Sequence, residues 1–331
     1  MRAAFFKGDE KIVLQEVPVP DRKSGQALIK VKACGVCGSE KKMWRQGKEV
    51  IPGHEAAGEV QEVDEDSAFA PGDRVALYLP HFCGTCYYCQ QGKTNLCRNI
   101  EDMIGHNIDG GYAEYVVVEE STLIDLEGLS YEEGVLLLDT IGTTGHGLRM
   151  GRAAQENLAL VVGCGPIGLG AAAVLKCMGL KKIYATDIIP ERLDYAEKLG
   201  AVPLDVRNNE LAGTVENEHP EGFPLIINCV GSPQTIKENL KYVTGGGKIV
   251  YIGEYWQEWT IKPRSDFMLK DWSFIRSWYF PLTEVEANRS MLQNHPEISE
   301  KIISHTFSLS EIDRAFDLFF QGQTAKAVIK F

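Results

Sequence analysis

A glycine-rich turn between two apolar segments constrains the fold of this chain most strongly. Leu158–Val162 is a short apolar run that predicts a buried strand. It leads into Gly163-Cys164-Gly165-Pro166-Ile167-Gly168, and an alanine-rich segment of helical character follows as far as Gly179. The next strand is expected at residues 182–186 and ends on Asp187. A GxGxxG motif between strand and helix, with an acidic residue about 20 positions later, predicts a dinucleotide-binding unit on a parallel sheet.

Each position of the motif has a physical role. Gly163 permits the tight turn, Gly165 lets a pyrophosphate approach the backbone, and Gly168 lets the helix pack closely on the sheet. The positive N-terminus of the helix, at Pro166 and Ile167, is expected to face the phosphates.

Residues beyond the motif predict which coenzyme binds. Asp187 would accept hydrogen bonds from the adenosine ribose and repel a 2′-phosphate, which favours NAD over NADP. Arg192, one helical turn on, either covers the adenosine edge or is a solvated helix residue. Two further strands, within 225–231 and 245–253, are expected to end at the mouth of the same sheet. The coenzyme contacts expected there are Val230, Ile252 and Gly253.

The first 120 residues have a different texture. Short apolar runs alternate with proline- and glycine-rich turns, which predicts an all-β unit with long loops. The expected strands are residues 3–6, 27–33, 57–63, 74–79 and 112–118. An amphipathic helix at 309–320 and a last strand at 325–331 are expected to return the chain to this unit.

Four closely spaced cysteines predict a closed metal site. They are Cys83, Cys86, Cys89 and Cys97. Four thiolates can complete a tetrahedron around zinc and leave no open position, so the site would be structural. An iron–sulfur cluster and two disulfides are the alternatives.

A second set of residues could form an open metal site. Cys37 and His54 lie in the stretches Cys34-Gly35-Val36-Cys37-Gly38-Ser39-Glu40 and Pro52-Gly53-His54-Glu55. Asp139, which ends an apolar run, is the best third ligand. Alternatively, Cys34 and Cys37 are small buried residues, His54 is a turn residue and Asp139 is a helix cap.

Composition excludes several classes of protein. The chain has 331 residues, which favours two domains, and its net charge of -12 makes nucleic acid and anionic membranes poor partners. The uncharged run 158–175 is interrupted by glycine and proline, so we expect a buried strand and helix rather than a membrane span. The opening MRAAFFKGDEKIVL lacks the apolar core of a secretory signal, and a cytoplasmic location is expected.

With these motifs in this order, the chain resembles the zinc-dependent medium-chain alcohol and polyol dehydrogenase family over essentially its whole length. The matching pieces are CGxCG[ST], GHE, CxxCxxCx7C, DGGxAEY, an acidic residue after an apolar run, and GxGxxG followed by Asp. The resemblance implies a two-domain α/β fold: a GroES-like β catalytic domain and a Rossmann domain with a doubly wound parallel sheet. The expected boundaries are 1–147 catalytic, 148–278 NAD-binding, and 279–331 returning to the catalytic domain.

The resemblance also implies roles for individual residues and two zinc ions per chain. Cys37, His54 and Asp139 would hold the catalytic zinc, and Glu55 would lie beside it and exchange as a ligand during turnover. Ser39 would take the alcohol proton, and Thr143 would lie against the nicotinamide. The residues expected near the substrate pocket are Trp44, Leu79 and His106. Cys34 would be a buried residue at a strand end.

Two departures from the family pattern affect the expected chemistry. Asp139 stands where alcohol dehydrogenase has a second thiolate, which resembles the polyol and sugar dehydrogenase branches. Lys42 stands where several relatives have a proton-relaying histidine, so the relay either uses Lys42 or ends at the coenzyme ribose and water.

The resulting hypothesis is NAD-dependent oxidation of an alcohol, leaning to a polyol, sugar alcohol or cyclitol, by a homodimer or homotetramer. The alternatives are a primary, secondary or amino-alcohol (threonine-type) dehydrogenase using NAD(P), a zinc-free reductase of the same superfamily, and a non-catalytic NAD-binding relative.

Overall fold

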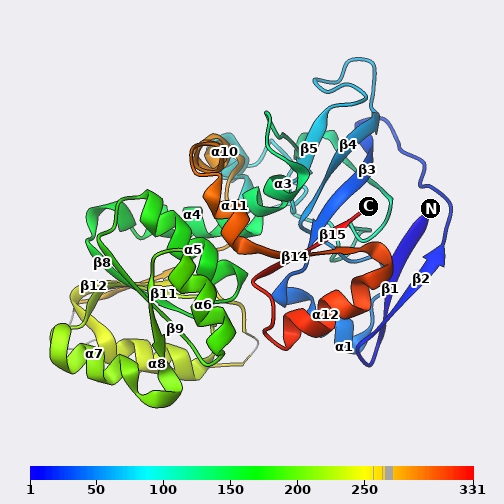
Figure 1. Cartoon of the computed structure of the whole chain (residues 1–331). Coiled ribbons are helices and arrows are strands. Elements are labelled where there is room, and N and C mark those ends of the chain that lie inside the picture. The colour runs from blue at the N-terminus through cyan, green and yellow to red at the C-terminus, as the bar shows by residue number, and fades with distance from the viewer. Residues whose placement is uncertain (256, 263, 265–270) are drawn as a thin grey trace. The chain divides into compact units, whose positions relative to one another are not determined.

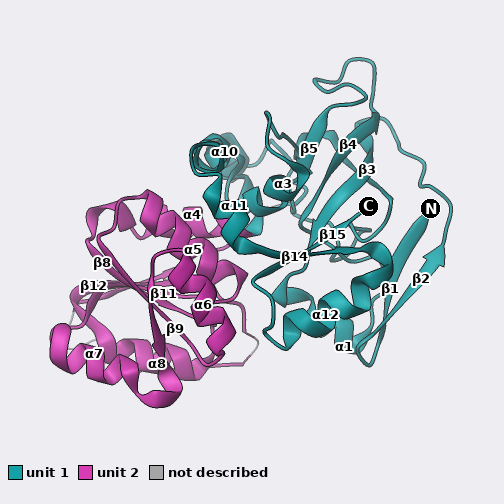
Figure 2. Ribbon diagram, in the orientation of Figure 1, with its two compact units in different colours: residues 1–139, 280–331 teal, residues 140–279 magenta. Residues whose placement is uncertain are grey.

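The computed structural model describes residues 1–255, 257–262, 264 and 271–331. The chain divides into two compact units, residues 1–139 with 280–331 and residues 140–279 (Figure 2). The boundaries expected from the sequence, after residues 147 and 278, differ slightly from this division. The first division falls earlier because helix α4 (Thr144–Met150) packs on helix α5 (Pro166–Cys177) and on the sheet of the second unit.

The first unit is built on a seven-stranded sheet that the two ends of the chain share (Figure 1). The strand order is β14-β15-β3-β4-β5-β7, and β6 also pairs with β3. The bounds are β3 Gln26–Gly35, β4 Ala56–Glu62, β5 Arg74–Leu77, β6 Tyr115–Glu119, β7 Leu123–Asp125, β14 Ile303–Ser308 and β15 Lys326–Lys330. The last strand runs antiparallel to β3, with Ile329 opposite Cys34. The expected return of the chain therefore takes the form of β15 paired with β3.

A hairpin and several helices complete this unit. The hairpin is β1 (Arg2–Gly8) with β2 (Lys11–Glu16), and the helices are α1 Lys41–Gln46, α2 Tyr87–Gln90, α3 Tyr131–Leu137, α10 Val285–Asn294, α11 Glu297–Ile302 and α12 Ile312–Phe320. The expected apolar face of α12 is buried. Phe316 from this face packs on Phe6 and Tyr112, with ring centroids 5.0 and 5.7 Å away. An aromatic cluster thus joins the first, middle and last parts of the unit.

The second unit contains a six-stranded parallel sheet in the order β10-β9-β8-β11-β12-β13. The strands are β8 Leu158–Val162, β9 Lys182–Asp187, β10 Val202–Asp205, β11 Phe223–Asn228, β12 Val243–Tyr251 and β13 Ser273–Arg276. Besides α4 and α5, the helices include α6 Pro190–Lys198, α7 Glu210–Glu218 and α8 Pro233–Tyr242. Read in chain order the sheet is 3-2-1-4-5-6, the Rossmann arrangement, in which ligands bind beyond the strand ends where the order reverses between β8 and β11. The predicted fold class is confirmed.

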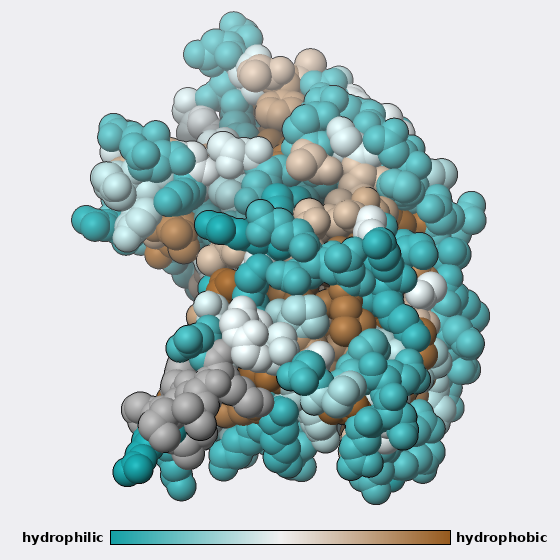
Figure 3. Space-filling view, turned by 90° about the vertical axis from the view of Figure 1, so that its left-hand side faces the viewer, coloured by the Kyte–Doolittle hydropathy of each residue, from teal (hydrophilic) through white to brown (hydrophobic). Residues whose placement is uncertain are grey.

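The uncharged run 158–175 forms strand β8 and most of helix α5, as expected. Among the described residues, none of the helices has the length and apolar character needed to cross a membrane. Hydrophilic residues cover most of the molecular face drawn in Figure 3, with apolar residues scattered between them.

Candidate metal centres and coenzyme site

Four predicted ligands from three parts of the first unit meet in one buried cluster. Cys37 follows β3, His54 and Glu55 precede β4, and Asp139 follows α3. Each offers a donor atom, and these atoms all lie within 4.8 Å of one another. The Asp139 Oδ2 atom is 3.7 Å from Cys37 Sγ and 3.4 Å from His54 Nε2. The structure thus brings together a thiol, an imidazole and carboxylates, the ligand types of zinc.

Glycines around residues 51–53 position His54. Gly53 has a φ of +101°, and a Cβ there would lie 2.8 Å from the backbone nitrogen of Tyr112. Gly110 and Gly111 donate backbone hydrogen bonds of 2.7 Å to the carbonyls of Ile51 and Gly53. This pairing explains why β6 begins at Tyr115 rather than at the expected residue 112. A loop that only glycine can form therefore fixes the segment that carries His54.

Glu40 lies directly behind His54, and no motif in the sequence pointed to it. The Glu40 side chain is completely buried, and its Oε1 lies 3.2 Å from His54 Nδ1. Its Oε2 accepts hydrogen bonds from the Tyr112 hydroxyl at 2.7 Å and from the Cys37 backbone at 3.2 Å. A carboxylate behind a metal-binding histidine fixes the ring and raises its basicity. The available signal was an acidic residue three positions after Cys37.

Lys326 is a second residue that the sequence analysis missed. This fully buried lysine of β15 forms an ion pair with Glu55 and donates a 3.2 Å hydrogen bond to the Val36 carbonyl. Burial raises the pKa of Glu55 to about 6, although Lys326 opposes this shift. The only sequence signal was a lysine that directly precedes the apolar run Ala327–Ile329 of the last strand.

The donor set fits a divalent cation. Burial raises the pKa of the Cys37 thiol, whereas the adjacent His54 lowers it. Glu55 Oε1 is buried and has no hydrogen-bond partner among the described residues. The buried Cys37 thiol, the buried Glu55 carboxyl group paired to Lys326 and the partly buried Asp139 carboxyl group leave anionic capacity that a bound zinc would neutralise.

The four cysteines of the loop around α2 form a second cluster in the first unit. Three of their sulfur–sulfur distances are 3.6, 3.6 and 3.9 Å. These exceed a disulfide bond of about 2.05 Å. They match the edges, about 3.8 Å, of a tetrahedron with zinc–sulfur bonds of about 2.3 Å. Backbone N–H groups of Thr85 and Cys86 lower the pKa of Cys83 to about 5, which favours the thiolate that a metal requires.

The glycine-rich turn in the second unit has the shape of a phosphate cradle. Gly163 has a φ of +92°. A Cβ on Gly168 would lie 1.7 Å from the carbonyl oxygen of Gly163. Gly165 is the N-cap of α5, and a Cβ there would meet nothing within 4 Å. Pro166 and Ile167 form the first turn of this helix. The open space at Gly165 lies where a helix N-terminus favours an anion, which fits a dinucleotide pyrophosphate.

Asp187 ends β9 beside this turn. Its Oδ2 accepts a 2.7 Å hydrogen bond from the Cys164 backbone, and its Oδ1 accepts bonds of 2.8 and 2.9 Å from Ile188 and Ile189. The carboxylate is therefore held in one orientation next to the motif. Arg192 is half-buried, and its Nε atom has no hydrogen-bond partner among the described residues.

The ends of β11 and β12 approach each other near the same turn. Asn228, which the sequence analysis missed, accepts hydrogen bonds from the backbones of Val230 and Gly231 at 3.1 and 2.7 Å. A Cβ on Gly253 would lie 2.6 Å from the Gly231 nitrogen, and one on Gly163 would lie 2.5 Å from Val230 Cγ2. Ile252 and Gly253 both donate to the Asn228 carbonyl at 3.0 Å. The structure thus brings Val230, Ile252 and Gly253 together.

Of the remaining predicted residues, two lie near the first cluster and the others lie at various places in the fold. Near the first cluster, the ring of His106 lies 4.9 Å from that of His54, and Ser39 Oγ donates a 3.3 Å hydrogen bond to Cys37 Sγ. Trp44 is instead a core residue that packs on Phe316 and Phe320. The placements of the others are these: Cys34 and Leu79 are buried, Lys42 is exposed on α1, and Thr143 is buried at the end of a π-helix, Asp139–Thr143.

Comparison with known proteins agrees with this geometry. Residues 23–128 match the alcohol dehydrogenase GroES-like domain, and residues 166–294 match the zinc-binding dehydrogenase domain. An uncharacterised zinc-type alcohol dehydrogenase-like protein of Escherichia coli K12 is 32% identical over 100% of this chain and 99% of its own. Sorbitol dehydrogenase of Bacillus subtilis is 30% identical over 76% of this chain and 75% of its own.

The structure agrees with that of a solved alcohol dehydrogenase. The enzyme from Thermus sp. ATN1 superimposes with a TM-score of 0.93 and 30% identity, and the match covers 100% of both chains. The motifs, both sheets and these full-length similarities lead to one conclusion: the chain belongs to the zinc-dependent medium-chain dehydrogenase family.

Proposed function

We propose that this protein is an NAD-dependent, zinc-dependent dehydrogenase that oxidises an alcohol, preferentially a polyol, sugar alcohol or cyclitol. The observation that carries the proposal is the buried cluster of Cys37, His54, Glu55 and Asp139, whose donor atoms lie within 4.8 Å of one another. Three protein ligands with one position left open are the arrangement of catalytic zinc sites. The similarity to a sorbitol dehydrogenase supports the preference for polyols.

The residues of the chain have distinct roles in this reaction. A zinc ion held by Cys37, His54 and Asp139 would supply Lewis acidity, and NAD would accept the hydride. The Glu40 carboxylate stands 3.2 Å behind the His54 ring, and Lys326 pairs with Glu55 beside the cluster. Ser39 is half-buried beside Cys37, which supports the role of its hydroxyl in taking the proton of the substrate. Lys42 is exposed on α1, which supports transfer of that proton towards solvent.

The orientation of Asp187 supports NAD as the coenzyme. Backbone N–H groups hold its carboxylate beside the phosphate cradle, where it would pair with ribose hydroxyls and repel a 2′-phosphate. The closed Cys83–Cys86–Cys89–Cys97 cluster would hold a second, structural zinc.

Substitution of Cys37 by Ala tests the catalytic zinc. We expect two zinc ions per chain in the wild-type protein and one in the variant, with NAD-dependent turnover reduced at least about hundredfold because a ligand is lost. Cys177→Ala, at the end of α5, is the matched control and should retain both ions. Undiminished turnover in Cys37→Ala would contradict the assignment.

A panel of polyols, sugars, amino alcohols and alkanols measured with NAD and NADP would separate the proposed substrate class from the threonine-type and simple-alcohol alternatives.

We also infer a cytoplasmic homodimer or homotetramer. The nine cysteines form no disulfide, and thiols that bind metal persist in reducing compartments. Light scattering, compared with the 36.7 kDa mass of one chain, would determine the number of subunits.

A further inference from the structure

Backbone contacts attach the loop of residues 104–112 rigidly to the segment that carries His54. Gly105 has a φ of +72°, and a Cβ there would lie 2.7 Å from the carbonyl carbon of Gly53. Beyond this contact, Gly110 and Gly111 bond to the carbonyls of Ile51 and Gly53. The backbone between these anchors is therefore held close to the segment that carries His54.

His106 lies in this stretch, and the hydrogen bonds of the loop around it do not use its ring. The His106 backbone nitrogen bonds to the Met103 carbonyl at 3.0 Å. The Asn107 side chain accepts from the Met103 nitrogen at 2.7 Å and donates to the Glu101 carbonyl at 2.5 Å. Along the described chain, no residue hydrogen-bonds to the His106 ring nitrogens, and the ring is half-buried.

The ring lies next to the reaction centre. Its centroid is 4.9 Å from that of His54, and the two planes are inclined by 44°. His106 is not one of the four residues whose donor atoms cluster, so it stands beside the ligand set rather than within it. The ring nitrogens of this half-buried imidazole are not taken up by the described part of the protein, so they are available to a polar ligand. A bound substrate that excludes water there is discriminated by whether it can pair with them.

We propose that His106 determines specificity by hydrogen-bonding the hydroxyl group adjacent to the reacting one, so that the site selects vicinal diols and polyols over simple alcohols. The inference rests on the proposed function and deepens it. A neutral imidazole offers one N–H donor and one acceptor nitrogen, and a hydroxyl group can satisfy either. In a simple alkanol the neighbouring carbon carries no hydroxyl group. When such a substrate binds, it covers the ring nitrogens without pairing with them, which costs binding free energy.

The test uses the zinc-loaded protein with NAD and two substrates that differ by one hydroxyl, butane-2,3-diol and butan-2-ol. In His106→Phe we expect the KM for the diol to rise about tenfold, through the loss of one hydrogen bond to a polar group, with its kcat little changed. The KM for butan-2-ol should stay the same or fall, because the phenyl ring has no polar atom to desolvate. His106→Asn keeps a donor and an acceptor and should recover most of the affinity for the diol. Titration of the diol into the enzyme–NADH complex should show the same tenfold rise in dissociation constant without catalysis.

Two controls separate this role from a structural one. His295→Phe changes an exposed histidine that pairs with Glu297 and should leave both substrates unaffected. Zinc content should remain at two ions per chain in His106→Phe. If His106→Phe weakens both substrates equally, loses zinc, or leaves the preference for the diol unchanged, the specificity role is wrong while the proposed function stands. If the wild-type protein oxidises neither alcohol, the proposed function fails and this inference fails with it.

Discussion

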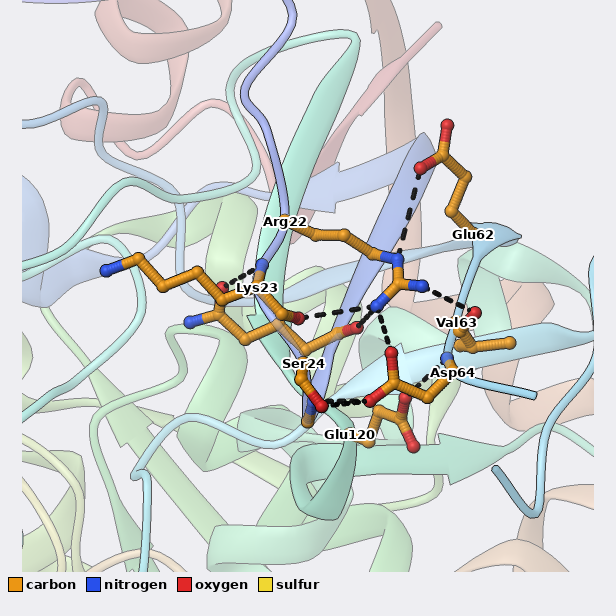
Figure 4. Close-up of polar contacts among 9 residues, drawn as sticks. Arg22, Lys23, Ser24, Glu62, Val63, Asp64 and Glu120 are labelled. Carbon is orange, nitrogen blue, oxygen red and sulfur yellow. Dashed lines mark hydrogen bonds and ion pairs between the residues drawn. The ribbon is translucent and has the colours of Figure 1, made fainter. Parts of the chain in front are cut away.

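At the scale of single residues, Asp64 shows how a surface carboxylate can join the ends of two strands. Arg22 Nη1 lies 2.5 Å from Asp64 Oδ1, and the Ser24 hydroxyl and Gly25 nitrogen each donate to Asp64 Oδ2 at 2.7 Å (Figure 4). Arg22 also donates to the Val63 carbonyl at 2.7 Å. The Arg22 guanidinium and the other donors lower the pKa of Asp64 to about 2.

This shift predicts a pH-dependent contribution to stability. Because the folded protein holds the pKa of Asp64 below its ordinary value near 4, the contribution is complete above that value and is lost as the pH falls towards 2. We therefore expect Asp64→Asn to lower the unfolding midpoint at pH 7 and to have little effect near pH 2. Thermal unfolding across this range measures it, with the exposed Asp66→Asn as the control. A deficit that is equally large at pH 2 would contradict this reading of the Arg22–Asp64 contact.

At the scale of elements, the contact between helix α5 and the turn after β8 determines whether the coenzyme cradle forms. A Cβ on Gly168 would lie 1.7 Å from the Gly163 carbonyl oxygen and 2.8 Å from its carbonyl carbon. These are backbone atoms, so the clash cannot be relieved by a change of rotamer. The helix must move, and the open space at Gly165 changes with it.

Gly168→Ala should therefore destabilise the protein by about 2 kcal/mol or more and weaken NADH binding at least about tenfold. Gly213→Ala is the matched control, since Gly213 lies within α7 and a Cβ there meets nothing within 4 Å. That variant should be unchanged or more stable by up to about 1 kcal/mol, because alanine is the better helix former. Urea unfolding and NADH fluorescence titration measure the two effects. Equal behaviour of the two alanine variants would rule out the proposed packing constraint.

At the scale of the whole chain, residues near the C-terminus complete a site that begins near residue 37. Strand β15 pairs with β3, and its Lys326 forms a completely buried ion pair with Glu55. The next lysine in the strand, Lys330, pairs with Glu132 at the surface, where its side chain is 53% exposed. The same strand thus offers one buried and one exposed ion pair of the same type.

Lys326→Met should destabilise the protein by about 3–5 kcal/mol, because it leaves the buried Glu55 carboxylate without its partner. Lys330→Met should cost no more than about 1 kcal/mol, since an exposed pair contributes little. Chemical unfolding compares the two variants. If both variants lose the same small amount of stability, the buried Lys326–Glu55 pair does not stabilise the fold more than the exposed Lys330–Glu132 pair does.

Local sequence patterns predicted much of this molecule. Spacing within the 83–97 loop brought four thiols together, and the order of strand, GxGxxG and helix matched β8 and α5 closely. Such patterns succeed because a few adjacent residues share one turn or one strand, so their separation along the chain nearly determines their separation in space. The predicted strand ends were less accurate where backbone from a distant part of the chain takes the hydrogen bonds. Tyr112, the expected start of β6, instead donates its backbone N–H to the Pro52 carbonyl.

By itself the sequence determined the kinds of ligand, the two sheets and the cradle for a dinucleotide, because residue type and short-range periodicity specify them. Only the tertiary structure revealed that Glu40 stands behind His54, that Lys326 pairs with Glu55 and that the His106 ring lies against His54. These contacts join segments whose approach depends on sheet pairing and on loops that only glycine can form. No periodic pattern in the chain encodes them, because each is a consequence of how the packed elements meet.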